Sequence, residues 1–282
     1  MSEDVSRLEL REVRGPSALG GGWRRSLELL SLIAVTDFKR TYFGTALGYV
    51  WSIARPLMLF GVLLAVFTQV FRIGDDVPNY PVLLLFNIVL FSFFQEATLT
   101  AVYSVVNQES VVRKTQFPRL VIPVAVVVTG LFNLGLNLVV VFVFILAWSI
   151  DPTWSWLLLT VTLTLLFVLT TAVSMIVSSL YPRFRDTAII WGVAATVLFY
   201  GTPLLYPAEV APDSLQAVMQ LNPLAPIFEL ARVWVIDPTA PGPLDLAGGG
   251  AALAGAAAIY LAVCAFAVWI FNREAPRIAE QL

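Results

Sequence analysis

Histidine is absent from this sequence of 282 residues, and cysteine occurs only once, as Cys264. Without histidine the chain lacks the most frequent general base, the most frequent metal ligand and any Ser-His triad. A single cysteine forms neither an intramolecular disulfide nor a thiolate metal cluster. Because no group of carboxylates has metal-ligand spacing either, the sequence predicts no catalytic centre and no metal site in this chain.

Charge is also scarce, since 13% of the residues are charged and 59% are hydrophobic. A soluble domain carries about 25% charged residues. The charges are clustered and leave apolar runs of about 20 residues, the length that crosses a bilayer as a helix. We therefore predict an all-α polytopic membrane protein with six transmembrane helices, at roughly 47–71, 81–103, 120–148, 155–181, 188–206 and 249–271.

The remaining segments flank this transmembrane domain, which we place at 46–272. Residues 1–22 are polar, and we expect them to form a mobile cytoplasmic tail; residues 273–282 form a second tail. Between 23 and 45, apolar residues recur at spacings of three and four, as in Leu27, Leu30, Ala34 and Phe38. This pattern predicts an amphipathic helix that lies along the membrane surface or packs on a partner domain.

Lysine and arginine predict the orientation. They occur before the first span, in the second and fourth connections and in the C-terminal tail, whereas the other connections carry mainly aspartate and glutamate. Cytoplasmic segments are enriched in positive charge. Both termini are therefore expected in the cytoplasm, which agrees with an even number of spans.

The connection before the last span is unusual. Residues 207–247 are rich in proline and contain two short helix-like pieces, Ser214 to Leu221 and Pro226 to Val235. Pieces of this length cannot cross a bilayer but suit short helices that re-enter the outer leaflet or lie on it. We expect an outer gate or lid over a transport pathway.

Two ionisable residues stand out inside the predicted spans, Arg55 in the first and Glu96 in the second. Antiparallel neighbouring helices would place them at similar depth, so we predict that they form a buried charge pair, in which each offsets the other's desolvation. The alternative is that Arg55 reaches toward lipid headgroups while Glu96 faces water in a central channel.

No phosphate-binding G-x-x-x-x-G-K-[ST] loop is present, and the two lysines, Lys39 and Lys114, do not follow glycine. Energy for uphill transport must then come from a partner or an ion gradient. The short connections 107–119 and 182–186 are either plain linkers or small helices that insert into a partner, and composition does not decide between these readings.

Aromatic residues are numerous, with 19 Phe, 8 Tyr and 8 Trp. Many suit the aromatic belts found at both membrane surfaces. A second interpretation is that some rings line a channel and stack on the apolar faces of sugars. The candidate channel residues are Tyr49, Trp51, Phe86, Phe93, Phe94, Phe199 and Tyr200.

Four segments resemble the permeases of polysaccharide-export ABC transporters, a family of the type-2 ABC exporter class that moves O-antigen, teichoic acid and capsule. The first is Asp37-Phe38-Lys39-Arg40-Thr41-Tyr42 with Leu47-Gly48-Tyr49-Val50-Trp51 and Arg55-Pro56-Leu57. In this segment Arg40 lies one position earlier than the arginine of the family pattern. The others are Phe117-Pro118 with Leu120 and Ile122-Pro123, then Arg185-Asp186, then Asn222-Pro223-Leu224 through Arg232. They follow the family's order and cover about residues 24–271.

The resemblance implies a homodimer that binds two copies of a separate ABC ATPase subunit, which would hold ATP and magnesium; this chain would hold no cofactor and bind no nucleic acid. Its interface helix would use Asp37, Lys39, Arg40 and Tyr42. Its ATPase-coupling residues would be Glu109, Val111, Arg113, Lys114, Phe117, Arg183, Arg185 and Asp186. Its outer gate would contain Tyr206, Pro207, Asn222, Pro223, Glu229 and Arg232.

The resemblance also implies the substrate and the location, which are a lipid-linked polysaccharide and the bacterial inner, or cytoplasmic, membrane with its lipids. Three alternatives remain open from the residues. They are a type-2 ABC permease for a small or lipidic substrate, an ion-coupled secondary transporter and a membrane glycosyl- or acyltransferase. The second predicts more buried carboxylates, and the third needs a catalytic carboxylate or histidine in a large loop.

Overall fold

The fold is a bundle of long helices, and a computed structural model describes residues 23–42, 48, 50–72, 77–108 and 119–281. In chain order the long helices are α1 (Trp23–Tyr42), α2 (Val50–Ala65), α3 (Tyr80–Asn107), α5 (Val121–Ala147), α6 (Leu159–Leu180), α7 (Thr187–Gly201) and α10 (Gly249–Gln281). Shorter pieces are the π turn η1 (Val66–Val70), the 3-10 turns η3 (Trp154–Leu158) and η4 (Ala208–Val210), and helices α8 (Asp213–Gln220) and α9 (Leu224–Val235). No strand occurs among these residues.

Five stretches are long and apolar enough to cross a membrane: Val50–Val70, Tyr80–Asn107, Val121–Ala147, Trp154–Leu180 and Gly249–Glu274. These match five of the six predicted spans to within about four residues, which is the usual uncertainty of helix ends. The candidate span that ends at Glu274 agrees with the predicted end of the last span, and α10 continues beyond it as one helix to Gln281. The chain is therefore an all-helical polytopic membrane protein.

The fifth predicted span, 188–206, is wrong at its end. Helix α7 stops at Gly201 after 15 residues, which is about 22 Å of helix at 1.5 Å per residue. Thr202 is extended, with φ −96° and ψ 144°, because Pro203 disfavours the helical conformation of the residue before it. Residues 202–206 are instead held against α3, where the Tyr80 hydroxyl donates to the carbonyl of Leu205 at 2.7 Å and Asn87 Nδ2 donates to that of Leu204 at 3.2 Å.

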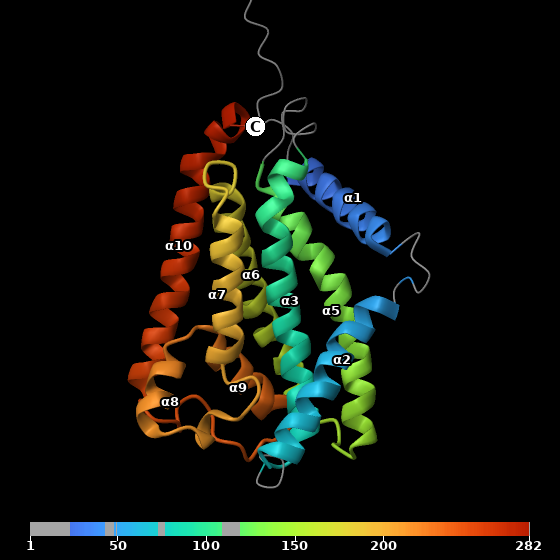
Figure 1. The fold of residues 1–282 in the computed structure, drawn as a ribbon, viewed down its shortest axis with the longest axis vertical. Helices are drawn as coiled ribbons and strands as arrows, with labels where there is room; N and C mark the ends of the chain where they lie inside the picture. The colour runs from blue at the N-terminus through green and yellow to red at the C-terminus, as the bar shows by residue number, and fades with distance from the viewer. Residues whose placement is uncertain (1–22, 43–47, 49, 73–76, 109–118, 282) are drawn as a thin grey trace, which may run out of the picture.

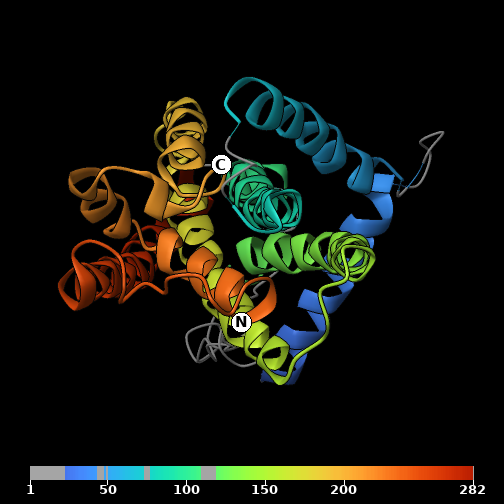
Figure 2. The same ribbon diagram turned by 90° about the horizontal axis from the view of Figure 1, so that it is seen from below.

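Helix α3 lies near the middle of the bundle, with α2, α5, α6 and α7 packed around it (Figures 1 and 2). Accordingly, α3 contributes most of the fully buried large side chains, among them Tyr80, Phe86, Phe91 and Phe94. Much of α2, α7 and α10 remains on the outside of the bundle and carries exposed apolar side chains such as Val62, Ile189 and Leu261. Large exposed apolar faces of this kind are expected where helices contact lipid or another protein.

The two ends of the bundle differ in composition. One end contains the end of α3, the α6–α7 connection and the end of α10, whereas α8 and α9 lie at the other end (Figure 1). Arg119, Arg183, Arg185 and Arg273 belong to the first end; Asp151, Glu209, Asp213, Asp237 and Asp245 belong to segments at the second. Most described arginines at the two ends therefore lie at the first and most acidic residues at the second, with Arg72 and Arg232 in segments of the second end and Asp186 and Glu274 at the first.

Candidate functional site

An ion pair joins Arg232 on α9 to Glu209 in η4. Arg232 Nη1 lies 2.8 Å from Glu209 Oε1 and 3.0 Å from Oε2, so both carboxylate oxygens face one guanidinium nitrogen. The Arg232 side chain is 8% exposed, whereas that of Glu209 is 34% exposed. The pair therefore spans 23 residues of chain and holds η4 against α9, with the arginine as its buried member.

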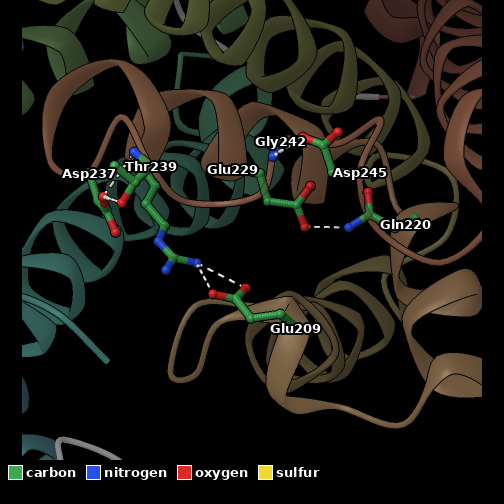
Figure 3. Close-up of polar contacts among 8 residues, drawn as sticks. Glu209, Gln220, Glu229, Asp237, Thr239, Gly242 and Asp245 are labelled. Atoms are coloured by element: carbon green, nitrogen blue, oxygen red, sulfur yellow. Dashed lines mark hydrogen bonds and ion pairs between the residues drawn. The ribbon is translucent and has the colours of Figure 1, made fainter. Parts of the chain in front are cut away.

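Beside this pair, Glu229 on α9 faces Gln220 on α8, and Gln220 Nε2 donates a hydrogen bond to Glu229 Oε1 (Figure 3). Glu229 is only 6% exposed. Burial raises the pKa of its carboxyl group to about 7; the hydrogen bond from Gln220 opposes this, Glu209 adds to it and Arg232 opposes it. A carboxyl group with this pKa exchanges its proton near neutral pH.

Asn222 fixes the start of α9. Its side-chain oxygen accepts a hydrogen bond from the backbone amide of Leu224 at 3.0 Å, and its Nδ2 donates to Thr202 Oγ1 at 2.7 Å. One side chain therefore ends the α8–α9 turn and ties it to the segment that follows α7. The neighbouring Pro223 occupies the N-cap position of α9, and Pro207 is buried at the N-cap of η4.

The structure thus gathers Tyr206, Pro207, Asn222, Pro223, Glu229 and Arg232, the residues predicted for an outer gate, around α8, α9 and η4 at one end of the bundle. Sequence reasoning missed Glu209 and Gln220, which supply the partners of Arg232 and Glu229. Gln216 was also missed, although it donates to the carbonyl of Ala211 at 2.7 Å and accepts from the amide of Ala247 at 3.2 Å. No local pattern marks these residues, because each partner lies in a different segment.

At the opposite end, the predicted coupling residues Arg183, Arg185 and Asp186 lie in the turn between α6 and α7 and are exposed. The Arg185 guanidinium stacks 5.0 Å from the Tyr181 ring centroid, and Arg183 Nη1 lies 3.9 Å from Glu274 on α10. The turn is therefore held to two helices. The other predicted coupling residues, Glu109, Val111, Arg113, Lys114 and Phe117, lie outside the described residues.

Helix α1, predicted as the interface helix, packs along α5. Ala34 is fully buried, Thr129 Oγ1 donates to its carbonyl at 3.2 Å, and the rings of Phe38 and Phe132 meet edge-on at 5.5 Å. Lys39 is exposed and Asp37 is half-buried. Arg40 and Tyr42 belong to the helix, but their side chains lie outside the described part of the structure.

A cavity of about 1020 Å³ lies between α1, α2, α3 and α5. Both Arg55 and Glu96 line it, together with Asp37, Asn133 and Asn137. Arg55 and Glu96 are both described residues, and no ion pair within 4.0 Å joins them. The structure therefore brings the two charges to one cavity, and their direct pairing stays a prediction.

The proposed channel aromatics divide into three groups. Phe86 and Phe94 are 0% and 1% exposed and do not line the cavity described above, so their place in a channel stays a prediction. Phe93 is buried on the cavity wall, and Phe199 packs edge-on against Phe91 at 5.3 Å. Trp51 and Tyr200 are exposed on the outside of the bundle, and Tyr49 is not among the described residues.

Comparison with known proteins places the chain. The model of the ABC-2 type transporter family matches residues 28–235, from α1 to the end of α9. Two proteins of Klebsiella pneumoniae named "O-antigen export system permease protein RfbA" are 31% and 29% identical over 199 residues, 70% of this chain and 76% of each relative. A protein of that name from Myxococcus xanthus is 28% identical over 202 residues, 71% of this chain and 76% of its own length. The bundle of apolar helices described above belongs to a member of the ABC-2 type transporter family, a membrane-embedded transport subunit.

Proposed function

We propose that this chain is the permease subunit of an ATP-driven exporter that moves a lipid-linked O-antigen, or a similar cell-envelope glycan such as teichoic acid, across the bacterial inner membrane. The observation that carries the proposal is the similarity to O-antigen export permeases over 70% of the chain at up to 31% identity. The match to the ABC-2 type transporter family, over residues 28–235, includes most of α1, the α6–α7 turn and α9, where the candidate residues lie.

The proposal includes the assembly. The permease acts as a homodimer with two copies of an ABC ATPase. The ATPase holds ATP and magnesium, because the printed sequence contains no phosphate-binding loop. Both termini lie in the cytoplasm, so that the arginine-rich end of the bundle meets the ATPase and α8 and α9 lie at the outer surface. The sorting of charges between the two ends supports this orientation.

Depleting the chain in its native host should make lipid-linked glycan accumulate inside the cell while surface glycan falls. The polymer is still built on its lipid carrier, but its route outward is missing. Mass spectrometry of the extracted lipid-linked glycans would measure the accumulation and identify the glycan. Restoring the wild-type chain is the control, and normal surface glycan without accumulation would contradict the proposed substrate.

The purified chain should hydrolyse no ATP by itself. Phosphoryl transfer needs a nucleotide site that positions the phosphates and magnesium, and the sequence provides none of the expected motif. A phosphate-release assay on the chain in nanodiscs, with and without its co-expressed ATPase, measures this. Turnover by the permease alone, after removal of contaminating ATPases, would refute the assignment as a partner-driven subunit.

A further inference from the structure

Two buried oxygens face each other across the contact between α8 and α9 without a donor. Gln220 Nε2 donates to Glu229 Oε1, which leaves Gln220 Oε1 and Glu229 Oε2 as the second oxygen of each group. Both of these oxygens are buried, and neither has a hydrogen-bond partner among the described residues. Figure 3 shows them on the same side of the bond that joins the two side chains. The pair therefore has one donor fewer than it needs.

A single proton on Glu229 Oε2 would correct this. A protonated carboxyl group is a donor as well as an acceptor, and its O–H would point at Gln220 Oε1. The amide and the acid would then exchange two hydrogen bonds and satisfy both oxygens at once. The ionised form would instead leave two buried acceptors side by side, which is unfavourable in a low-dielectric site.

The surrounding charges are few. Glu209 and Arg232 face Glu229 from η4 and α9, and Arg232 already contacts both oxygens of Glu209. Helices α6 and η3, which also pack on α9, contain no ionisable residue, and α8 contributes only Asp213 at its far end. The connection after α9 adds Asp237 and Asp245, which are acidic and accept hydrogen bonds within that connection (Figure 3). The surroundings therefore supply no second cation to hold Glu229 ionised, and burial favours its neutral form.

This contact is one of those that hold helix α8. The helix has eight residues, too few to be stable alone. It packs against α10 and η4; its Met219 is buried, whereas Leu215 and Val218 are exposed. The side-chain bonds that hold it are those of Gln216 to Ala211 and Ala247 and that of Gln220 to Glu229. Loss of one of these bonds should loosen the whole helix.

We propose that Glu229 is protonated in this structure and forms a two-bond latch with Gln220 that holds α8 to α9, and that loss of the proton opens the latch. The latch rests on the geometry of the two side chains. Its use as a pH-sensitive control of an outer gate rests on the proposed function.

The stability of the folded chain should fall as the pH rises. Burial raises the pKa of Glu229 above its ordinary value, to about 7. Such a group stabilises the folded protein at pH values below the ordinary pKa of a glutamate, and this contribution is lost as the pH rises through the folded-state pKa. Because the chain has no histidine, few other groups titrate in this range.

The test compares the whole chain with two variants in nanodiscs, without ATPase or glycan. Glu229→Gln keeps two hydrogen bonds, amide to amide, but cannot titrate; Gln220→Leu removes the partner. Between about pH 5 and about pH 8, the wild-type melting temperature should fall and hydrogen exchange in residues 213–235 should increase, after correction for intrinsic exchange rates. Glu229→Gln should show little pH dependence and match the acidic wild type.

Infrared difference spectroscopy adds a readout that does not depend on a variant's stability. The wild type should lose a protonated-carboxyl band as pH rises, and Gln220→Leu should shift that band because its hydrogen bond is gone. A Glu229→Gln variant with the wild-type pH dependence, or an infrared band unchanged by Gln220→Leu, overturns the latch. Since no transport is measured, either result leaves the proposed export function to its own test.

Discussion

Replacing Arg185 with alanine should reduce glycan export at least about 10-fold, a loss in the range of typical coupling energies, while the chain remains folded and bound to its ATPase. Arg185 is exposed in the α6–α7 turn. Its guanidinium stacks on Tyr181 at 5.0 Å, and the Tyr181 ring meets the Tyr103 ring of α3 edge-on at 5.0 Å. These contacts connect the turn to the central helix of the bundle, so a movement of the turn reaches α3.

The loss should be functional rather than structural. An exposed arginine–aromatic contact contributes only about 0.5–1 kcal/mol. Asp186→Ala should behave in the same way, because the start of α7 uses the backbone carbonyl of Asp186, which accepts from the amide of Ile190 at 2.9 Å. ATP hydrolysis and glycan movement, measured on the same proteoliposomes, should separate, with hydrolysis kept and export lost.

Arg273 provides a matched control. It lies at the same end of the bundle on α10, and its guanidinium stacks 5.3 Å from the Trp269 ring. Arg273→Ala therefore removes the same kind of contact and leaves the Arg185–Tyr181 contact in place, although Arg273 also lies 3.9 Å from Glu274, which Arg183 of the turn contacts at the same distance. Normal export by Arg185→Ala, or an equal loss in Arg273→Ala, would show that the turn does not couple the ATPase to α3.

Replacing Glu209 with glutamine should destabilise the fold by about 2–3 kcal/mol. Breaking a buried ion pair costs about 3–5 kcal/mol because the remaining charge is left without a partner. The Arg232 side chain that stays behind is 8% exposed, so water cannot replace the lost carboxylate. The expected loss is smaller than that for a fully buried pair because Glu209 itself is one-third exposed and the Glu229 carboxyl is nearby.

Replacing Arg232 instead of Glu209 should destabilise the fold less. Comparing the two variants therefore tests whether the loss comes from leaving a buried charge without a partner. Arg232→Met keeps an apolar side chain in the buried position and leaves Glu209, which water reaches, as the remaining charge. We expect a loss of about 1 kcal/mol or less, as for partly exposed pairs. Thermal unfolding in detergent should rank the double variant close to Arg232→Met. Equal losses for the two single variants would contradict the desolvation argument.

Hydropathy predicted the transmembrane helices well because the constraint is simple: a helix that crosses the hydrocarbon core needs about 20 apolar residues wherever it lies in the bundle. Hydropathy alone does not show which side of a membrane helix faces lipid and which faces protein. Helix α3 carries the polar residues Ser92, Glu96 and Thr100 at spacings of four, and these line the cavity, whereas its many apolar residues carry no such mark. Lipid and protein interior select the same apolar side chains, so the sequence alone does not separate the fully buried Phe86 and Phe94 from Phe93, which lies on the cavity wall.

In the connection between α7 and α10, the sequence predicted the helices but not the contacts between them. Its two short helices were predictable, because proline and turn residues act within a few positions of the chain. The partners inside it were not, because Glu209 meets Arg232 and Gln220 meets Glu229 only after the turns around Asn222 and Pro207 have folded. In the same way, Arg55 and Glu96 share a cavity because α2 and α3 pack together.

By itself, the sequence determined that this chain is a helical membrane protein, where most of its helices run, and which family motifs it carries, since these depend on local composition and on residues in order. The tertiary structure alone decided that residues 202–206 are held against α3, that α3 is enclosed by its neighbours, and which buried charge meets which partner. Those outcomes depend on distances between segments that are far apart in the chain, and the free energy of a buried polar group is set by the partner that packing places beside it.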